Sequence, residues 1–88
     1  MKTVHLIIRG KVQGVNFRAS AQKEAERLGL TGWVQNVTEG VEAVASGKEM
    51  AVSQFVAWCH KGPARASVQG VTLEEVPYTS FGRFSIRR

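Results

Sequence analysis

The decisive stretch of this sequence is Gly10-Lys11-Val12-Gln13-Gly14-Val15-Asn16-Phe17-Arg18, which lies between an apolar run at residues 4–8 and a helix-like run at residues 19–28. A strand that stops at a glycine-flanked loop and continues as a helix leaves backbone N–H groups without acceptors. The helix dipole adds partial positive charge there, so such a loop suits an anion, phosphate above all. Arg18 falls where the helix begins, and its planar fork of donors matches two phosphate oxygens. The chemistry alone therefore predicts a phosphate-binding loop with a charged clamp.

The same stretch has a plainer interpretation. Two glycines spaced Gly-x-x-x-Gly also mark ordinary turns. Taken by itself, the motif fits a simple strand-to-helix connection, with Arg18 on the surface, about as well as it fits an anion site. Further residues are needed to choose between the two.

Length and charge restrict the classes of function. Residues 1–88 make one domain, which buries roughly 60–65% of the surface that its unfolded chain exposes. Twelve Lys and Arg stand against seven acidic residues, all of them Glu, for a net charge of +5. The absence of Asp excludes an Asp nucleophile and an Asp-based Mg²⁺ site. The positive charge suits anionic partners, which include both small phosphate compounds and nucleic acid.

The remaining composition predicts no metal, no cofactor and no membrane partner. Cys59 is the single cysteine, so no internal disulfide forms, and its apolar surroundings favour a small buried hydrophobe over a reactive thiol. Two histidines and one cysteine, scattered along the chain, do not make a metal site. There is no run of about 18 apolar residues, and the N-terminal residues show no signal-peptide pattern. We expect a cytoplasmic protein.

The hydrophobic pattern predicts seven elements. They are strands at 2–9, 31–37, 41–46, 67–76 and 84–87 and helices at 17–29 and 48–60, with a loop at 10–15 and a hairpin turn at 38–40. The order β-α-β-β-α-β, with a short additional strand, is that of a ferredoxin-like α/β (α+β) sandwich. Both helices are expected on one face of a mainly antiparallel sheet.

This topology brings Asn36 toward the glycine-flanked loop. The two strands of a β-α-β unit are parallel, so their C-terminal ends lie at the same edge of the sheet. The strand at 41–46 is expected to insert between them, antiparallel to both. From its position alone Asn36 is also a good turn residue before the hairpin. Gln13 carries a side chain suited to the loop, but its backbone N–H is the preferred contributor.

Four motifs of this chain resemble the acylphosphatase family, in the form of a small stand-alone acylphosphatase. They are Gly10-x-Val12-Gln13-Gly14-Val15-x-Phe17-Arg18, Gly32-Trp33-Val34-x-Asn36, Gly62-Pro63-x-x-Ala66-x-Val68 and Phe84-Ser85-Ile86-Arg87. The likeness covers essentially the whole chain in the family's order. Two features depart from the family pattern. The turn at 37–40 looks one residue shorter, with Glu39 where Asp is common. Asn16, at the variable loop position, is small and polar where a larger or apolar residue is frequent, which makes it a candidate to line the pocket.

The resemblance implies hydrolysis of the carboxyl–phosphate bond of acyl phosphates, without metal or cofactor. By motif position, Arg18 is expected to bind the phosphoryl oxygens and Asn36 to orient the attacking water. The phosphate-binding amides are expected to be those of Gln13, Gly14, Val15, Asn16, Phe17 and Arg18. The implied partners are an acyl phosphate substrate and inorganic phosphate, as product and competitor, and the enzyme is expected to be a monomer.

Two rival interpretations remain. Ferredoxin-like sheets also bind RNA through aromatic side chains on their open face, and the positive charge agrees with that role. The strands lack interleaved basic and aromatic residues, however, so we expect no nucleic-acid partner. An inactive domain of the same fold is the other rival, and the presence of both Arg18 and Asn36 argues against it.

Overall fold

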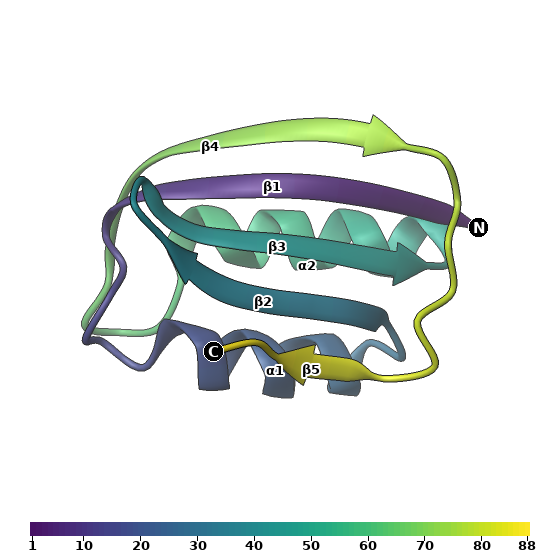
Figure 1. The fold of residues 1–88 in the computed structure, drawn as a ribbon, viewed down its shortest axis with the longest axis horizontal. Helices are drawn as coiled ribbons and strands as arrows, with labels where there is room; N and C mark the ends of the chain where they lie inside the picture. The colour runs from purple at the N-terminus through teal and green to yellow at the C-terminus, as the bar shows by residue number, and fades with distance from the viewer.

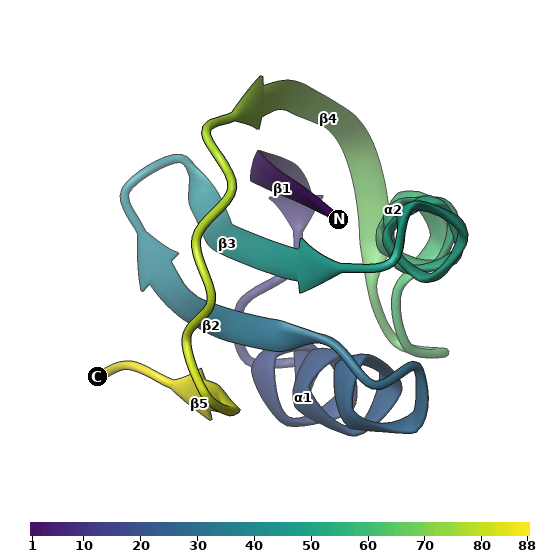
Figure 2. The same ribbon diagram turned by 90° about the vertical axis from the view of Figure 1, so that its right-hand side faces the viewer.

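Two helices cover one face of a five-stranded sheet in the computed structural model, which describes residues 1–88 (Figures 1 and 2). The elements are β1 (Lys2–Lys11), α1 (Phe17–Arg27), β2 (Thr31–Val37), β3 (Gly40–Gly47), α2 (Glu49–Lys61), β4 (Ser67–Val76) and β5 (Phe84–Ile86). The strand order is β4-β1-β3-β2-β5, and only the β2–β5 pair is parallel. The predicted ferredoxin-like α/β sandwich with an extra strand is confirmed.

Strand β1 forms the centre of the core. Val4, Leu6 and Ile8 alternate toward the helices and are buried, as the period-two pattern predicts. They face the buried residues of β3 across the antiparallel register, in which Ile8 lies opposite Val41. Strand β3 therefore lies between β1 and β2, and the C-terminal ends of β1 and β2 share one edge of the sheet.

The end of β1 differs from the expectation. Strand β1 continues to Lys11, and the connecting loop spans residues 12–16, where the pattern predicts a strand that ends at residue 9. The added residues pair with β4 after a bulge between Arg9 and Gly10. Gly10 has a φ of 124°, and a Cβ there would collide with the backbone of Ser67 and Gln69. The glycine thus permits close pairing with a strand that lies almost sixty residues away in sequence.

The helices bury the side chains that their spacing predicts. Phe17, Ala21 and Ala25 of α1 are buried, as are Val52, Phe55 and Cys59 of α2. Burial raises the pKa of the Cys59 thiol far above its ordinary value, so the side chain behaves as a neutral hydrophobe. Trp58 packs beside this core, with ring centroids 5.3 Å from Phe17 and 6.3 Å from Phe55. Neither helix is long and apolar enough to cross a lipid bilayer.

The segment 77–83 carries the chain from one edge of the sheet to the other (Figure 2). Two backbone N–H groups hold it: that of Thr79 donates to Thr3 Oγ1 at 2.9 Å and that of Phe81 donates to Thr31 Oγ1 at 3.3 Å. Strand β5 then pairs in parallel with β2, with Phe84 opposite Gly32. This crossing delivers the last residues of the sequence to the edge where β1 and β2 end.

The open face of the sheet carries a polar cluster formed by His5, Gln35 and Glu42. The His5 imidazole and the Glu42 carboxylate are joined by a 2.6 Å hydrogen bond, and Gln35 Nε2 donates to the other carboxylate oxygen at 2.7 Å. The His5 hydrogen bond, followed by that of Gln35, holds the pKa of Glu42 below its usual value of 4.5. His5 is thus a sheet-face residue, as the strand pattern predicts.

Replacing Glu42 with Gln should flatten the acid limb of the stability curve. A carboxylate whose pKa is lowered by folding stabilises the native state above its unfolded pKa, and this contribution is lost as pH falls through the folded value. The free energy of unfolding of the wild type should therefore fall more steeply than that of Glu42→Gln below about pH 4.5. Urea titrations from pH 7 to pH 3 measure both curves. The exposed Glu39→Gln is the control, and parallel curves for all three proteins would contradict the assignment.

Candidate functional site

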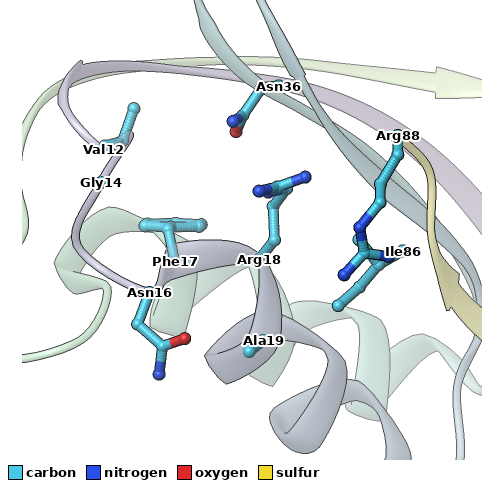
Figure 3. A pocket seen from close by; sticks show the side chains of 9 residues that line it. All are labelled: Val12, Gly14, Asn16, Phe17, Arg18, Ala19, Asn36, Ile86 and Arg88. Carbon is cyan, nitrogen blue, oxygen red and sulfur yellow. The ribbon is translucent and has the colours of Figure 1, made fainter.

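A pocket of about 310 Å³ lies at the sheet edge where β1 and β2 end (Figure 3). It is lined by the loop after β1, the start of α1, the end of β2 and the last residues of the chain. The lining residues are Val12, Gly14, Asn16, Phe17, Arg18, Ala19, Asn36, Ile86 and Arg88. None of these side chains is a carboxylate, so the charge of the pocket is that of two arginines.

Apolar side chains that are buried in the core hold the loop in place. Val12, Val15 and Phe17 are 1%, 4% and 2% exposed and belong to the main core. Complete burial of a side chain of this kind contributes roughly 1.5–3 kcal/mol. The intervening residues, Gln13, Gly14 and Asn16, are exposed. The loop is therefore anchored at three residues, and its backbone is kept at the surface between the anchors.

Two residues of the loop adopt the left-handed conformation. Gly14 has a φ of 74°, which glycine adopts without steric cost, and Asn16 has a φ of 66° and a ψ of 28° just before α1 begins. Asn is one of the few residues that enter this region readily. Asn16 lines the pocket, but its side chain points away from Arg18 and Asn36 (Figure 3). Its backbone conformation thus explains the asparagine better than a contact inside the pocket does.

The backbone N–H groups of this segment have no protein acceptor. No main-chain or side-chain hydrogen bond has a donor among the backbone amides of residues 13–16, and Asn16 makes no side-chain cap. The first helical bond of α1 runs from Ser20 N–H to the Asn16 carbonyl, so the amides of residues 17–19 are also free. A continuous row of donors from 13 to 19, at a helix N-terminus, is suited to surround an anion.

The side chain of Gln13 ties the loop to the β2–β3 hairpin. Gln13 Nε2 donates to the carbonyls of Val37 and Gly40, at 2.8 Å each. These two residues pair with each other across the two-residue turn Thr38-Glu39. The sequence pattern favours the backbone N–H of Gln13 as the group that it contributes to anion binding. The structural role of its side chain cannot be read from the loop sequence. The amide connects the loop directly to the strand end that carries Asn36.

Arg18 and Asn36 line the same pocket, although they come from different elements. Arg18 stands in the first turn of α1 and Asn36 near the end of β2, and Figure 3 shows their polar ends pointing toward one another. Neither side chain takes part in an ion pair or a hydrogen bond within the chain. Both are therefore free to contact a ligand in the pocket. Gly14, Asn16 and Phe17 line the pocket with them, whereas Gln13 and Val15 do not.

Sequence reasoning missed Ile86 and Arg88 as pocket residues. The alternation of Phe84 and Ile86 in the sequence indicates a closing strand, but the sequence does not indicate which strand it pairs with. Parallel pairing with β2 places Ile86 opposite Val34, two residues before Asn36. Arg88 follows two residues later and reaches the pocket from the side opposite the loop (Figure 3). The sequence signal that could have pointed to Arg88 as a pocket residue is the basic pair Arg87-Arg88.

The pocket offers donors rather than metal ligands. It contains no imidazole, thiolate or carboxylate, which are the groups that hold most divalent metals in proteins. Elsewhere in the chain no three His, Cys or Glu side chains are grouped to bind a metal ion. The pocket presents guanidinium, amide and backbone N–H groups, which are suited to contact an anion.

Comparison with known proteins identifies the family. A family model described as Acylphosphatase matches residues 4–86. This chain belongs to the acylphosphatase family. An acylphosphatase of Rubrobacter xylanophilus is 49% identical over 88 residues, which cover 98% of this chain and 80% of that protein. Membership of this family makes the chain an enzyme of the hydrolase class.

Solved acylphosphatase structures share the whole fold. A structure of an acylphosphatase from Coxiella burnetii has a TM-score of 0.94 at 41% identity, over 98% of this chain and 92% of that one. An acylphosphatase from Bacillus subtilis has a TM-score of 0.95 at 37% identity, over 100% of both chains. The acylphosphatase fold of this chain therefore extends from β1 to the short β5 strand that brings Arg88 to the pocket.

Replacing Gln13 with Ala should loosen the loop without unfolding the protein. The substitution removes both hydrogen bonds to the hairpin carbonyls, at a cost of about 1–2 kcal/mol in the free energy of unfolding. Order parameters of the backbone amides at residues 12–16, from ¹⁵N relaxation, should fall relative to the wild type. Gln54→Ala, an exposed glutamine of α2, is the matched control. Order parameters unchanged in Gln13→Ala would show that the apolar anchors alone hold the loop.

Proposed function

We propose that this chain hydrolyses acyl phosphates to a carboxylate and inorganic phosphate, using the pocket between the 12–16 loop and Asn36. One observation carries the proposal: a row of unpaired backbone N–H groups lies beside an unpaired guanidinium in a pocket without a carboxylate side chain. This arrangement is complementary to a phosphoryl group that gains negative charge as it is transferred. Family membership supports the same reaction.

The phosphoryl group is held by the amides from Gln13 to Arg18 and by the Arg18 side chain. The backbone donors are already in place, because the loop is anchored by buried valines and by the Gln13 side chain. Little reorganisation is then needed during the reaction, which is the condition under which such donors lower the barrier most. The guanidinium of Arg18 contacts two phosphoryl oxygens through its planar fork.

Asn36 positions the attacking water. Its amide does not titrate near neutral pH, so it orients the water by hydrogen bonding and removes no proton. The water oxygen forms a bond to phosphorus, and the bond between phosphorus and the acyl oxygen breaks. The acyl oxygen leaves with the electron pair as a carboxylate. One proton of the water passes to a phosphoryl oxygen, and the other stays on the new P–OH group. A carboxylate is a good leaving group, so positioning and charge stabilisation are sufficient.

The proposal includes a monomeric, cytoplasmic enzyme that acts on a small molecule. Every element that lines the pocket belongs to one chain, so a single copy completes the site. The only thiol, on Cys59, is buried and unpaired, which suits a reducing compartment. RNA-binding sheets need free aromatic faces, whereas Trp33 on the open face is covered by the Arg87 guanidinium at 4.0 Å from its ring centroid.

Arg18→Ala should abolish most turnover while the fold survives. Initial rates on benzoyl phosphate, measured in EDTA, test the function directly, and inorganic phosphate should compete with the substrate. Loss of the preorganised clamp should lower kcat/KM about 10²- to 10³-fold, which corresponds to about 3–4 kcal/mol of transition-state stabilisation.

Two variants serve as controls for that measurement. Arg65→Ala removes an exposed arginine that lines no pocket and should retain wild-type rates. Arg18→Lys keeps the charge but loses the fork, so its rate should fall between those of Ala and wild type. Circular dichroism checks the fold of each. Near-normal hydrolysis of benzoyl phosphate by Arg18→Ala would refute the assignment of the clamp.

Asn36→Ala should lower kcat more than it raises KM. A residue that holds the water contributes to the transition state of the attack and little to substrate affinity. Steady-state kinetics on benzoyl phosphate separates the two constants, and Thr38→Ala in the adjacent turn is the control. An increase in KM with an unchanged kcat would place Asn36 in substrate binding instead.

A further inference from the structure

Arg88 is a second unpaired guanidinium in the same pocket as Arg18. It lines the pocket and takes part in no ion pair and no hydrogen bond within the chain. No side chain of the pocket is a carboxylate that could balance the two charges. Two uncompensated positive charges around one small cavity favour a ligand that carries more than one anionic group.

Arg88 lies at the outer side of the pocket. In Figure 3 the Arg18 guanidinium lies between Asn36 and the Arg88 guanidinium, which is next to Ile86. Arg88 and Ile86 also line a neighbouring pocket of about 440 Å³ that contains Arg83 and Glu26. The Arg88 side chain is therefore part of the wall that the two pockets share, away from the row of loop amides.

The outer side of the pocket is the part that remains for the acyl group when the phosphoryl group lies against the loop amides and Arg18. In phosphoryl transfer the attacking and leaving oxygens are roughly in line through phosphorus. With the water held by Asn36, the acyl oxygen leaves on the far side of the phosphoryl group. Apart from the loop residues, Arg18 and Asn36, the pocket is lined by Ala19, Ile86 and Arg88, which are therefore the residues available to contact the acyl group.

We propose that Arg88 is a specificity residue that selects acyl phosphates whose acyl part carries a second anionic group, a carboxylate or a phosphate, near the mixed anhydride. The inference rests on the proposed function, because it assigns the acyl side of the same site. Ile86 contacts the carbon skeleton of the acyl group, and Arg88 pairs with its charge. The neighbouring pocket holds the Glu26 carboxylate, so the anionic group is expected close to Arg88 and not deep in that second pocket.

A matched set of substrates tests this assignment. Benzoyl phosphate has a neutral acyl part, whereas 3- and 4-carboxybenzoyl phosphate carry a carboxylate that the ring holds away from the mixed anhydride. The ratio of kcat/KM for a carboxylated substrate to kcat/KM for benzoyl phosphate is measured at constant ionic strength. Any electronic effect of the carboxylate is common to all enzyme variants, so changes in the ratio report the protein alone.

The wild type should prefer at least one carboxylated isomer, and Arg88→Gln should lower that ratio about fivefold, the size expected for an exposed ion pair. Lys48→Gln removes the same charge from the N-terminus of α2, outside every pocket, and should leave both rates and the ratio unchanged. Arg88→Lys should retain part of the preference.

Two results would overturn the inference while leaving the proposed function intact. One is a ratio that is the same in Arg88→Gln and wild type. The other is a parallel loss for all substrates together with weaker inhibition by inorganic phosphate, which would make Arg88 a second phosphate clamp. A wild type that hydrolyses none of the three substrates would instead overturn the proposed function itself.

Discussion

The unpaired N–H groups from residue 13 to residue 19 are the constraint around which this site is arranged. A backbone that turns its donors outward gives up the main-chain bonds that stabilise a strand or a helix interior. Other interactions must hold it, and here they are the buried side chains of Val12, Val15 and Phe17 and the two hydrogen bonds of Gln13. The hydrophobic core thus stabilises a loop conformation that its own main chain does not.

The order of strands decides which side chains reach the loop. Strand β3 separates β1 from β2 and forces them to run parallel, so the loop after β1 and Asn36 share one edge. Strand β5 joins β2 in parallel, and its C-terminal end points to the same edge. Three strand ends therefore converge on one pocket. The long crossing at 77–83 is what places Ile86 and Arg88 opposite the loop.

Sequence periodicity predicted the elements well where packing on one face controls them. The strands at residues 31–37 and 67–76 begin and end as predicted, and burial alternates over residues 31–35. The end of β1 was misjudged by two residues, since Gly10 and Lys11 owe their strand conformation to pairing with β4 and not to local preference. The family motif likewise includes Gln13 but does not show that its side chain ties the loop to the hairpin. Asn16 stands at a variable position of that motif, and only the structure shows its left-handed backbone.

By itself, the amino-acid sequence determined the element order, the fold class and the two groups, Arg18 and Asn36, whose chemistry suits a phosphoryl anion. The element order and the fold class follow from local spacing and from the handedness of β-α-β units, which act over a short span of chain. The choice of Asn36 as a site residue over a simple turn residue rests on the motif that it shares with the acylphosphatase family. Only the tertiary structure decided how the loop is held and that Arg88 joins the pocket. Both depend on pairings between segments far apart in sequence, namely β1 with β4 and β2 with β5, and such partners are selected by the packing of the whole sheet.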